Sequence, residues 1–291
     1  MDQFLGIDKA TRSLLIGSIL GDGEITIRYK NSRRKNHSYR EHYGKNQKEY
    51  RLWKQQLAPQ LLYMTPKSQT LRSKSSVLFT ELYPHFYDKL GQKHIPFKLL
   101  EHCNMLIVSA IIYMDDGSLC ISKRINHNQK KIFLSPHISL YLQCYSKDEL
   151  EGLNKKLWNK LGLSLRLSKR KDGLGYIIKT TTIENSLNFL NKVEMITKTC
   201  PPMFYKTNWN YRFSIEAFKL KLQYPDYETL SSCSNRHRNY SIKEIEKLIL
   251  LKQQKMSDQL IATTLGRSYW SVVYKIAELR KNGHLQRDDH Q

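Results

Sequence analysis

Two apolar runs of this 291-residue chain each end in an aspartate beside a glycine, and this repeat constrains the fold more than any other feature. The first run, "LLIGSILGDG", reaches Asp22 and Gly23, and the second, "SAIIYMDDG", reaches Asp116, 94 residues after Asp22. The C-terminal end of a helix carries partial negative charge, so a carboxylate there is disfavoured by about 0.3–1 kcal/mol. Two such ends, each followed by a segment with β character, predict a duplicated fold rather than two accidental turns.

The segments after the two aspartates follow the same order of helices and strands. Alternating apolar and polar residues predict a strand over 24–30, residues 68–82 are interpreted as a hairpin, and residues 83–91 as a short helix. A second hairpin is expected around Asp172 and Gly173. We therefore predict an α+β fold of two αββαββα halves over 1–98 and 99–224, followed by a linker over 225–239 and a helical domain over 240–291.

Capping residues mark several predicted helices. Ser146 and Ser241 are each followed by a glutamate three residues later, the spacing of a capping box. In the C-terminal domain, Gly266 is expected to end the second of three helices and Ser268 to begin the third. A short helix, a glycine turn and a helix carrying basic and aromatic residues predict a helix-turn-helix that binds DNA. A three-helix bundle with no DNA contact is the alternative.

The charge of the chain points to a polyanionic partner. Lysine and arginine number 48 against 26 acidic residues, which gives a formal net charge of +22. A surface this basic is typical of proteins that bind nucleic acid. No apolar stretch reaches the roughly 18 residues of a membrane-spanning helix. The N-terminus lacks the features of a signal peptide, and the five cysteines are scattered without zinc-site spacing, so we expect an intracellular protein.

The two aspartates predict a metal site if the two apolar helices pack side by side. Gly17 and Gly21, four residues apart, would allow close approach of the first helix. Asp22 and Asp116 would then meet beside two negative helix ends, an arrangement that a divalent cation relieves. Mg²⁺ takes carboxylate oxygens readily, and Mn²⁺ is expected to substitute for it. Paired carboxylates with metal beside a basic surface suit hydrolysis of a phosphodiester bond.

The strings "LIGSILGDG" (15–23) and "SAIIYMDDG" (109–117) resemble the two copies of the LAGLIDADG homing-endonuclease signature. The similarity covers about residues 10–210 and implies a monomer whose two sheets form a saddle on duplex DNA. It also implies metal-dependent cleavage of both strands at a long target site, with short 3′ overhangs, which promotes mobility of the encoding intron or gene. The implied metal ligands are Asp22 and Asp116 with the residues before them, Gly21 and Asp115, although Asp115 stands where the signature usually has a small residue.

Further strings resemble the single-chain subgroup that includes the yeast mitochondrial omega-intron enzyme. Lys93 in "QKHIP" and Lys206 in "PPMFYKTN" correspond to that subgroup's catalytic lysines, one in each half. An ammonium group near the scissile phosphate can stabilise the charge of the transition state. Gln47 and Arg51 in "NQKEYRLW" resemble peripheral water-ordering residues of the family, with Gln47 in a catalytic role.

Outward-facing strand residues supply the candidates for DNA contact, because a two-stranded ribbon fits the major groove and arginine there pairs with guanine. The candidates are Arg28, Lys30, Arg40, Arg51, Arg72 and Lys74 in the first half, Lys123, Arg124, Arg166, Lys169 and Arg170 in the second half, and Arg267, Tyr269, Trp270 and Lys275 in the C-terminal domain.

Two other functions are compatible with the same features. One is a transcriptional regulator that shares the two-motif region and the helix-turn-helix, but such proteins have lost the acids that this chain keeps at Asp22 and Asp116. The other is an RNA maturase, which would bind its own intron RNA on the same basic surface. A nuclease acting on single strands is a weaker third alternative.

Overall fold

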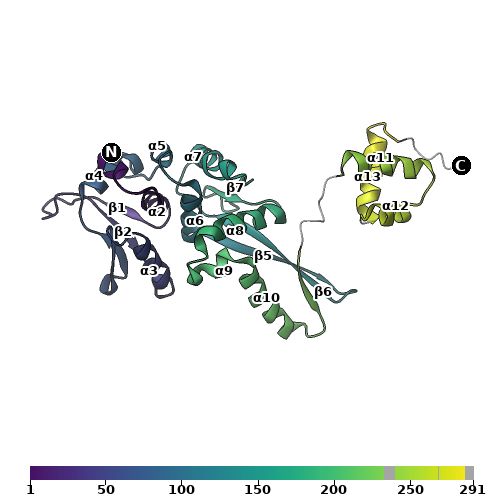
Figure 1. Ribbon diagram of the computed structural model, residues 1–291, viewed down its shortest axis with the longest axis horizontal. Helices are drawn as coiled ribbons and strands as arrows, with labels where there is room; N and C mark the ends of the chain where they lie inside the picture. Colours follow the sequence, from purple (N-terminus) through teal and green to yellow (C-terminus); the bar gives the residue numbers. More distant parts are fainter. Residues whose placement is uncertain (233–239, 268, 286–291) are drawn as a thin grey trace. The chain divides into compact units, whose positions relative to one another are not determined.

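The structure of the chain, a computed structural model, describes residues 1–232, 240–267 and 269–285, without the side chain of Trp270 (Figure 1). The chain divides into two units, Met1–Cys233 and Ser234–Gln291. Among the described helices, none has both the length and the apolar character needed to cross a membrane.

Two apolar helices form the centre of the first unit. Helices α2 (Lys9–Leu20) and α6 (Met105–Asp116) pack against each other along their lengths. A Cβ atom on Gly17 would lie only 2.9 Å from the Cβ atom of Ile111, so the close approach of the two helices requires a glycine at this position. The two apolar runs therefore lie side by side, with their C-terminal residues ending in the same region of the molecule.

Each central helix begins an equivalent series of elements. In the first half, α2 is followed by β1 (Glu24–Thr26), β2 (Ser38–His42), α3 (Lys48–Leu57), β3 (Leu62–Thr65), β4 (Thr70–Ser73) and α4 (Val77–Phe86). In the second half, α6 is followed by β5 (Gly117–Asn126), β6 (Lys131–Leu140), α7 (Lys147–Leu153), β7 (Arg166–Lys169), β8 (Tyr176–Lys179) and α8 (Ile183–Thr197). The strand orders β1-β2-β4-β3 and β5-β6-β8-β7 are the same, and all these pairs are antiparallel. The predicted α+β class with two αββαββα halves is confirmed.

One hydrophobic core runs through both halves. Alternate strand residues such as Ile25, Tyr39 and Leu71 are buried in it, and Leu119 and Ile138 are buried in the second half. Because successive strand residues point to opposite faces, the residues between them lie on the other face of each sheet. Arg40, Arg72, Arg124 and Arg166 lie on that second face, whereas Lys123 and Lys169 lie on the same face of their strands as Leu119 and Leu167.

The segment around residues 77–86 differs from its prediction. The expected hairpin over 68–82 keeps only β4, because α4 begins at Val77 and continues through Pro84. Its buried residues Leu78, Phe79, Leu82 and Phe86 have helical spacing, and burial of this face outweighs the cost of the proline. The predicted helix over 83–91 is thus the end of α4.

Other local predictions can be compared directly. Strand β1 is shorter than predicted and ends at Thr26, whereas β7 and β8 form the predicted hairpin around Asp172. Ser146 and Glu149 form the predicted capping box, and α7 continues through a π turn (Asn154–Trp158) and a 3₁₀ turn (Asn159–Leu161). The shorter helices of the first unit are α1 (Asp2–Leu5), α5 (Phe97–Leu100) and α9 (Phe204–Thr207), and further 3₁₀ turns lie at Lys45–Gln47, Pro66–Ser68 and Pro201–Met203.

Part of the predicted linker belongs to the first unit. Strand β9 (Glu228–Ser231) pairs in parallel with β6, from Lys131 opposite Glu228 onward, so the second sheet has five strands. It follows α10 (Trp209–Gln223), whose Leu220 packs with Ile132 and Leu134. The linker prediction was therefore wrong for residues 228–231, and residues 233–239 lie outside the described part.

The described residues of the second unit form three helices with a core of their own. They are α11 (Ile242–Gln253), α12 (Asp258–Leu265) and α13 (Tyr269–Lys281). The Ser241 capping box is present, and Gly266 ends α12 with a φ of +61°, a conformation that favours glycine. The predicted helix start at Ser268 lies outside the described residues.

Candidate active site and DNA interface

The ends of the two central helices bring acidic residues together. Asp22 follows Gly21, the C-cap residue of α2, and Asp116 is the last residue of α6. The side chain of Asp22 is 31% exposed, whereas Asp116 is largely buried. Burial, helped by the neighbouring carboxylates of Asp115 and Asp22, raises the pKa of Asp116 to about 7. The carboxylates at the two helix ends are therefore close enough for their negative charges to repel one another.

A lysine from each half contacts the end of one central helix. Lys93 Nζ donates hydrogen bonds to the carbonyl oxygens of Gly21 and Gly23, both at 3.0 Å. Lys206 Nζ donates to the carbonyl oxygens of Gly117 at 3.0 Å and Asp115 at 3.3 Å. Burial lowers the pKa of both lysines, and nearby acidic residues partly oppose the shift. The two lysines occupy equivalent places, because each binds the carbonyls on either side of a candidate catalytic aspartate.

Asp115 forms a buried ionic cluster with residues of the first half. Its carboxylate accepts hydrogen bonds from Tyr50 at 2.8 Å and from Lys54 Nζ at 2.9 Å. Lys54 also binds Glu41 at 2.7 Å, and Arg51 Nε lies 3.1 Å from the same carboxylate. We call Glu41, Arg51, Lys54 and Asp115 the ionic cluster; all four side chains are fully buried.

Asp115 was predicted as a metal ligand, and that role stays a prediction. Its carboxylate oxygens lie within 4.8 Å of those of Asp22 and Glu41, a spacing compatible with a metal. Arg51 and Lys54 nevertheless lie among these oxygens, and their positive charges already neutralise Asp115 and Glu41. The main-chain oxygen of Asp115, which accepts a hydrogen bond from Lys206, is a further possible ligand.

Arg51 was predicted to contact DNA, and the structure shows that prediction to be wrong. The guanidinium is fully buried, with Nη2 donating to Asp22 Oδ2 at 2.6 Å and Nη1 lying 3.5 Å from Asp115 Oδ1. Burial alone would lower the pKa of Arg51, but the carboxylates of Glu41 and Asp115 raise it above its ordinary value. A permanently charged group therefore holds the Asp22 carboxylate from inside the protein.

Gln47 lies in a different setting from the acids. It is exposed at the N-terminal end of α3, where its side-chain oxygen accepts a hydrogen bond from the N–H of Gly44 at 3.3 Å. Its described contact is with the turn before the helix, and its catalytic role stays a prediction.

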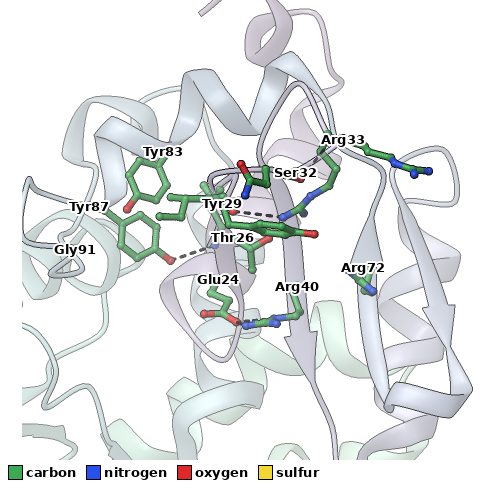
Figure 2. A pocket seen from close by; sticks show the side chains of 14 residues that line it. Glu24, Thr26, Tyr29, Ser32, Arg33, Arg40, Arg72, Tyr83, Tyr87 and Gly91 are labelled. Atoms are coloured by element: carbon green, nitrogen blue, oxygen red, sulfur yellow. Dashed lines mark hydrogen bonds and ion pairs between the residues drawn. The ribbon is translucent and has the colours of Figure 1, made fainter.

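The outer face of the first sheet carries a row of polar side chains. Glu24 is paired in register with Arg40, Arg40 with Arg72, and Arg72 with Tyr63, so the row crosses all four strands. Arg40 Nε donates to Glu24 Oε1 at 2.7 Å. Figure 2 shows this pair in a hollow of about 860 Å³ that Tyr29 also lines. Because Glu24 is two residues after Asp22, the row begins directly beside the acids.

The second sheet carries the equivalent row. Ser118, two residues after Asp116, is paired with Ser139, Ser139 with Lys179, and Lys179 with Arg166. A hollow of about 710 Å³ lies over this row and is lined by Ser139, Arg166 and Lys179 among others. The two halves therefore present hollows of similar size over equivalent rows, lined by different side chains.

Comparison with known proteins identifies the family of the chain. The model of the LAGLIDADG DNA endonuclease family matches residues 12–187, more than half of the chain. The chain belongs to this family. As a member of the LAGLIDADG family it is a metal-dependent DNA endonuclease. A search of curated proteins returned no significant match.

Several solved structures are similar to this LAGLIDADG protein. The homing endonuclease I-WcaI bound to its DNA recognition sequence is 21% identical, with a TM-score of 0.50 over 69% of this chain and 86% of that one. The meganuclease I-SmaMI bound to uncleaveable DNA is 13% identical, with a TM-score of 0.46 over 74% and 94%. I-DmoI in complex with DNA and Mn is 16% identical, with a TM-score of 0.40 over 64% and 96%.

Most other candidate DNA contacts of this LAGLIDADG protein lie on its surface. Arg170 binds Asp172 in its own turn, with Nε 3.0 Å from Oδ1, and Arg72 is half-buried. Lys179 was not among the predicted contacts, although it is paired in the sheet with the predicted contact Arg166. The exposed candidates are Arg28, Lys30, Lys74, Lys123, Arg124, Arg166 and Lys169.

In the second unit, Arg267 packs inward, which corrects its prediction as a DNA contact. Its side chain is 9% exposed, its Nη2 lies 3.1 Å from a carboxylate oxygen of Glu244, and its guanidinium lies 4.3 Å from the ring centre of Tyr240. Lys275 binds Glu278 at 2.7 Å, and Tyr269 is exposed. The side chain of Trp270 lies outside the described residues.

Proposed function

We propose that this chain is a site-specific homing endonuclease, acting as a monomer, that cuts both strands of a long duplex DNA site and leaves short 3′ overhangs. The observation that carries the proposal is the duplicated centre. Asp22 and Asp116 end two packed helices, and Lys93 and Lys206 bind the carbonyls on either side of them. One such centre for each strand accounts for a double-strand break by a single chain. Such a break would promote mobility of the intron or gene that encodes the protein.

The residues at the helix ends fit a divalent metal. Asp22 and Asp116 supply carboxylate oxygens, and the main-chain oxygens of Gly21 and Asp115 each keep a lone pair beyond the one that accepts from lysine. Oxygen ligands of this kind suit Mg²⁺, and Mn²⁺ accepts them as well. Burial and neighbouring acids raise the pKa of Asp116, which means that the negative charge of its carboxylate is poorly stabilised. A bound cation would stabilise that charge. When bound, the metal would activate water and stabilise the leaving oxygen.

The side chains of the protein set the remaining conditions for hydrolysis. Lys93 and Lys206 are held in place by two carbonyl groups each, so their ammonium charge is already oriented before DNA arrives. Charge that is fixed in a partly dry site stabilises a developing negative charge more than a mobile surface lysine does. Arg51 fixes one oxygen of Asp22 and leaves the other for a different partner.

The two rows on the sheets are proposed to read base pairs beside the cleavage positions. In the first half, Glu24 orients Arg40, which suits bidentate recognition of guanine. In the second half, Ser118 and Ser139 replace this pair, and the basic groups are Lys179 and Arg166. The target site is therefore expected to differ in sequence between its two halves.

Binding of the duplex target is expected to fall steeply with salt. A protein that neutralises six or more phosphates loses roughly 10³-fold or more in affinity between 50 and 200 mM salt. The affinity would be measured by fluorescence anisotropy on a labelled target in Ca²⁺, with the salt concentration as the only variable. A nearly flat dependence would contradict binding along a basic sheet face.

The second unit is proposed to be a helix-turn-helix that binds DNA beside the main site. Deleting residues 235–291 should weaken binding by about 100-fold, because a tethered second module raises the effective concentration at its site. Cleavage at saturating protein should persist, since the acids and lysines lie in the first unit. Single-turnover cleavage measures this, with the separate C-terminal piece added back as a control. Loss of turnover at saturation would show that the unit has another role.

The test of the proposed function is a pool of genomic duplexes incubated with the full chain in Mg²⁺ or in Ca²⁺, followed by sequencing of the ends. Staggered breaks with 3′ overhangs at discrete sites, in Mg²⁺ alone, are the expected result. Specific binding without breaks in any metal would favour the regulator or the maturase, and binding of the intron RNA would then separate these two.

A further inference from the structure

The two halves can be aligned residue by residue through their shared sheet register. Glu24 pairs with Arg40, and its equivalent Ser118 pairs with Ser139. The next residue along the second strand is Glu41 in the first half and Leu140 in the second half. Gln47, which precedes α3, comes six positions after Glu41, and Ser146, which precedes α7, comes six positions after Leu140. Helices α3 and α7 therefore align without a gap.

This alignment shows that the ionic cluster is built from one half of the duplication only. Arg51 and Lys54 of α3 correspond to Leu150 and Leu153, as Glu41 corresponds to Leu140. All six side chains are fully buried, so the first half carries three charged groups where the second half carries three leucines. The three charged residues contact one another, so the two halves differ by a whole charged group in the core and not by three separate substitutions.

The fourth member of the ionic cluster comes from the opposite half. Asp115 corresponds to Gly21, and a Cβ atom on Gly21 would lie 2.5 Å from Asp115 Oδ2. Asp115 therefore uses the space that Gly21 leaves and reaches into the first half. Glu41, Arg51 and Lys54 together carry one excess positive charge, and Asp115 neutralises it. Because a buried, unpaired charge is strongly destabilising, the first half needs this residue from the second half.

The same difference extends to the two catalytic acids. Arg51 donates to Asp22 at 2.6 Å, but the equivalent position beside Asp116 is Leu150, which offers no donor. Asp22 is thus held by a guanidinium that the ionic cluster fixes in turn, whereas Asp116 has no equivalent support.

We propose that Asp115 is a positioning residue: through Arg51 and Lys54 it fixes the Asp22 carboxylate, and the two centres consequently cut their strands at unequal rates. This inference rests on the proposed function. It predicts that the ratio of the two strand-cleavage rates depends on the ionic cluster. Asp115 would change this ratio through Arg51 and Lys54, without its side chain contacting DNA or metal.

The test uses the full chain and the duplex site found in the genomic pool, with a palindromic centre so that the DNA adds little strand bias. Single-turnover nicking of each strand is measured separately. Asp115→Asn should change the ratio of the two rates by about tenfold, because small displacements of a catalytic group have large effects on rate. The control Glu101→Gln, which removes a surface ion pair with Lys156, should leave the ratio unchanged.

A second variant separates positioning from stability. Combining Glu41→Leu, Arg51→Leu and Lys54→Leu gives the first half the leucines of the second half, and adding Asp115→Gly gives the second half the glycine that the first half has at Gly21. Replacing a buried ionic group by apolar residues is often neutral for stability, so this variant should keep its Tm, whereas Asp115→Asn should lower Tm by about 10 °C. Its strand rates should agree within about twofold. A variant that melts normally but keeps the wild-type ratio would overturn the proposal.

The melting experiments also distinguish failure of this inference from failure of the proposed function. If the wild type cuts no duplex, the proposed function fails, and the strand ratio has no meaning. The Tm of Asp115→Asn then still reports on the ionic cluster: a Tm equal to that of the wild type would overturn the pairing of Asp115 with the first half.

Discussion

The double variant Asp22→Asn/Asp116→Asn is expected to cut duplex DNA at least about 10³-fold more slowly than the wild type, because a metal bound by these acids would stabilise the transition state by several kcal/mol. Asparagine keeps the shape of each side chain but removes the charge that holds a divalent cation. Single-turnover cleavage of the target in Mg²⁺ measures the loss, and binding in Ca²⁺ shows whether the DNA still docks.

A matched control is Asp226→Asn, which removes an exposed carboxylate that lies 3.9 Å from Lys130 on the same unit. This variant should cut at the wild-type rate. If the double variant cut as fast as the control, the acids at the helix ends would not be catalytic, and the ligands would have to be sought elsewhere.

Asp116 also gives the acid pair a signature that is independent of DNA. Its pKa in the folded protein is about 7, raised by burial and by the neighbouring carboxylates. Between the ordinary pKa of an aspartate and about pH 7, Asp116 is protonated in the folded state but has lost its proton in the unfolded state. The stability of the folded state therefore falls as the pH rises through this range. Asp116→Asn should remove this part of the pH dependence in urea unfolding curves without metal. An unchanged pH dependence would contradict the raised pKa.

The sequence was sufficient for the duplication and for the position of the acids. Both depend on local signals: an apolar helix, a glycine and an aspartate, repeated before segments of similar pattern. The lysines required the family resemblance, because Lys93 and Lys206 have no local feature that distinguishes them from other lysines in so basic a chain. In the structure each meets the carbonyls of the helix end in its own half, a contact between segments about 70 and 90 residues apart.

The ionic cluster could not be predicted because its members look like surface residues. The sequence of α3, "KEYRLWKQQL", has a stripe of Tyr50, Trp53 and Leu57, and Lys54 lies one turn from Tyr50 on the same face. That spacing was the available signal. Whether such a lysine is buried depends on a carboxylate that arrives from another helix, which a local pattern does not contain.

The errors in secondary structure have a similar cause. Residues 77–82 were interpreted as part of a hairpin, but the four buried apolar side chains of α4 stabilise one helix over Val77–Phe86. Strand β9 is short and polar, and it exists because β6 offers it an edge in parallel register. In both cases tertiary packing decides between alternatives that local propensity leaves close in energy.

Replacing either Lys93 or Lys206 is expected to slow cleavage by about 10²–10³-fold, as removal of one fixed donor does in other enzymes. Lys93→Met and Lys206→Met keep the length of the side chain and remove only the ammonium group. Each should affect the rate of one strand more than the other, since Lys93 binds the end of α2 and Lys206 the end of α6. Strand-resolved nicking at saturating protein measures both effects.

The pH profile tests whether the charged form of these lysines is the active one. Burial lowers the pKa of Lys93 and of Lys206, so each loses its proton at a lower pH than an exposed lysine. If the ammonium stabilises the transition state, the cleavage rate falls on the alkaline side as this proton is lost. The exposed neighbour Lys89 provides the control Lys89→Met, which should change neither rate nor profile. A Lys93→Met variant that keeps both strand rates would show that this ammonium serves only to cap the helix end.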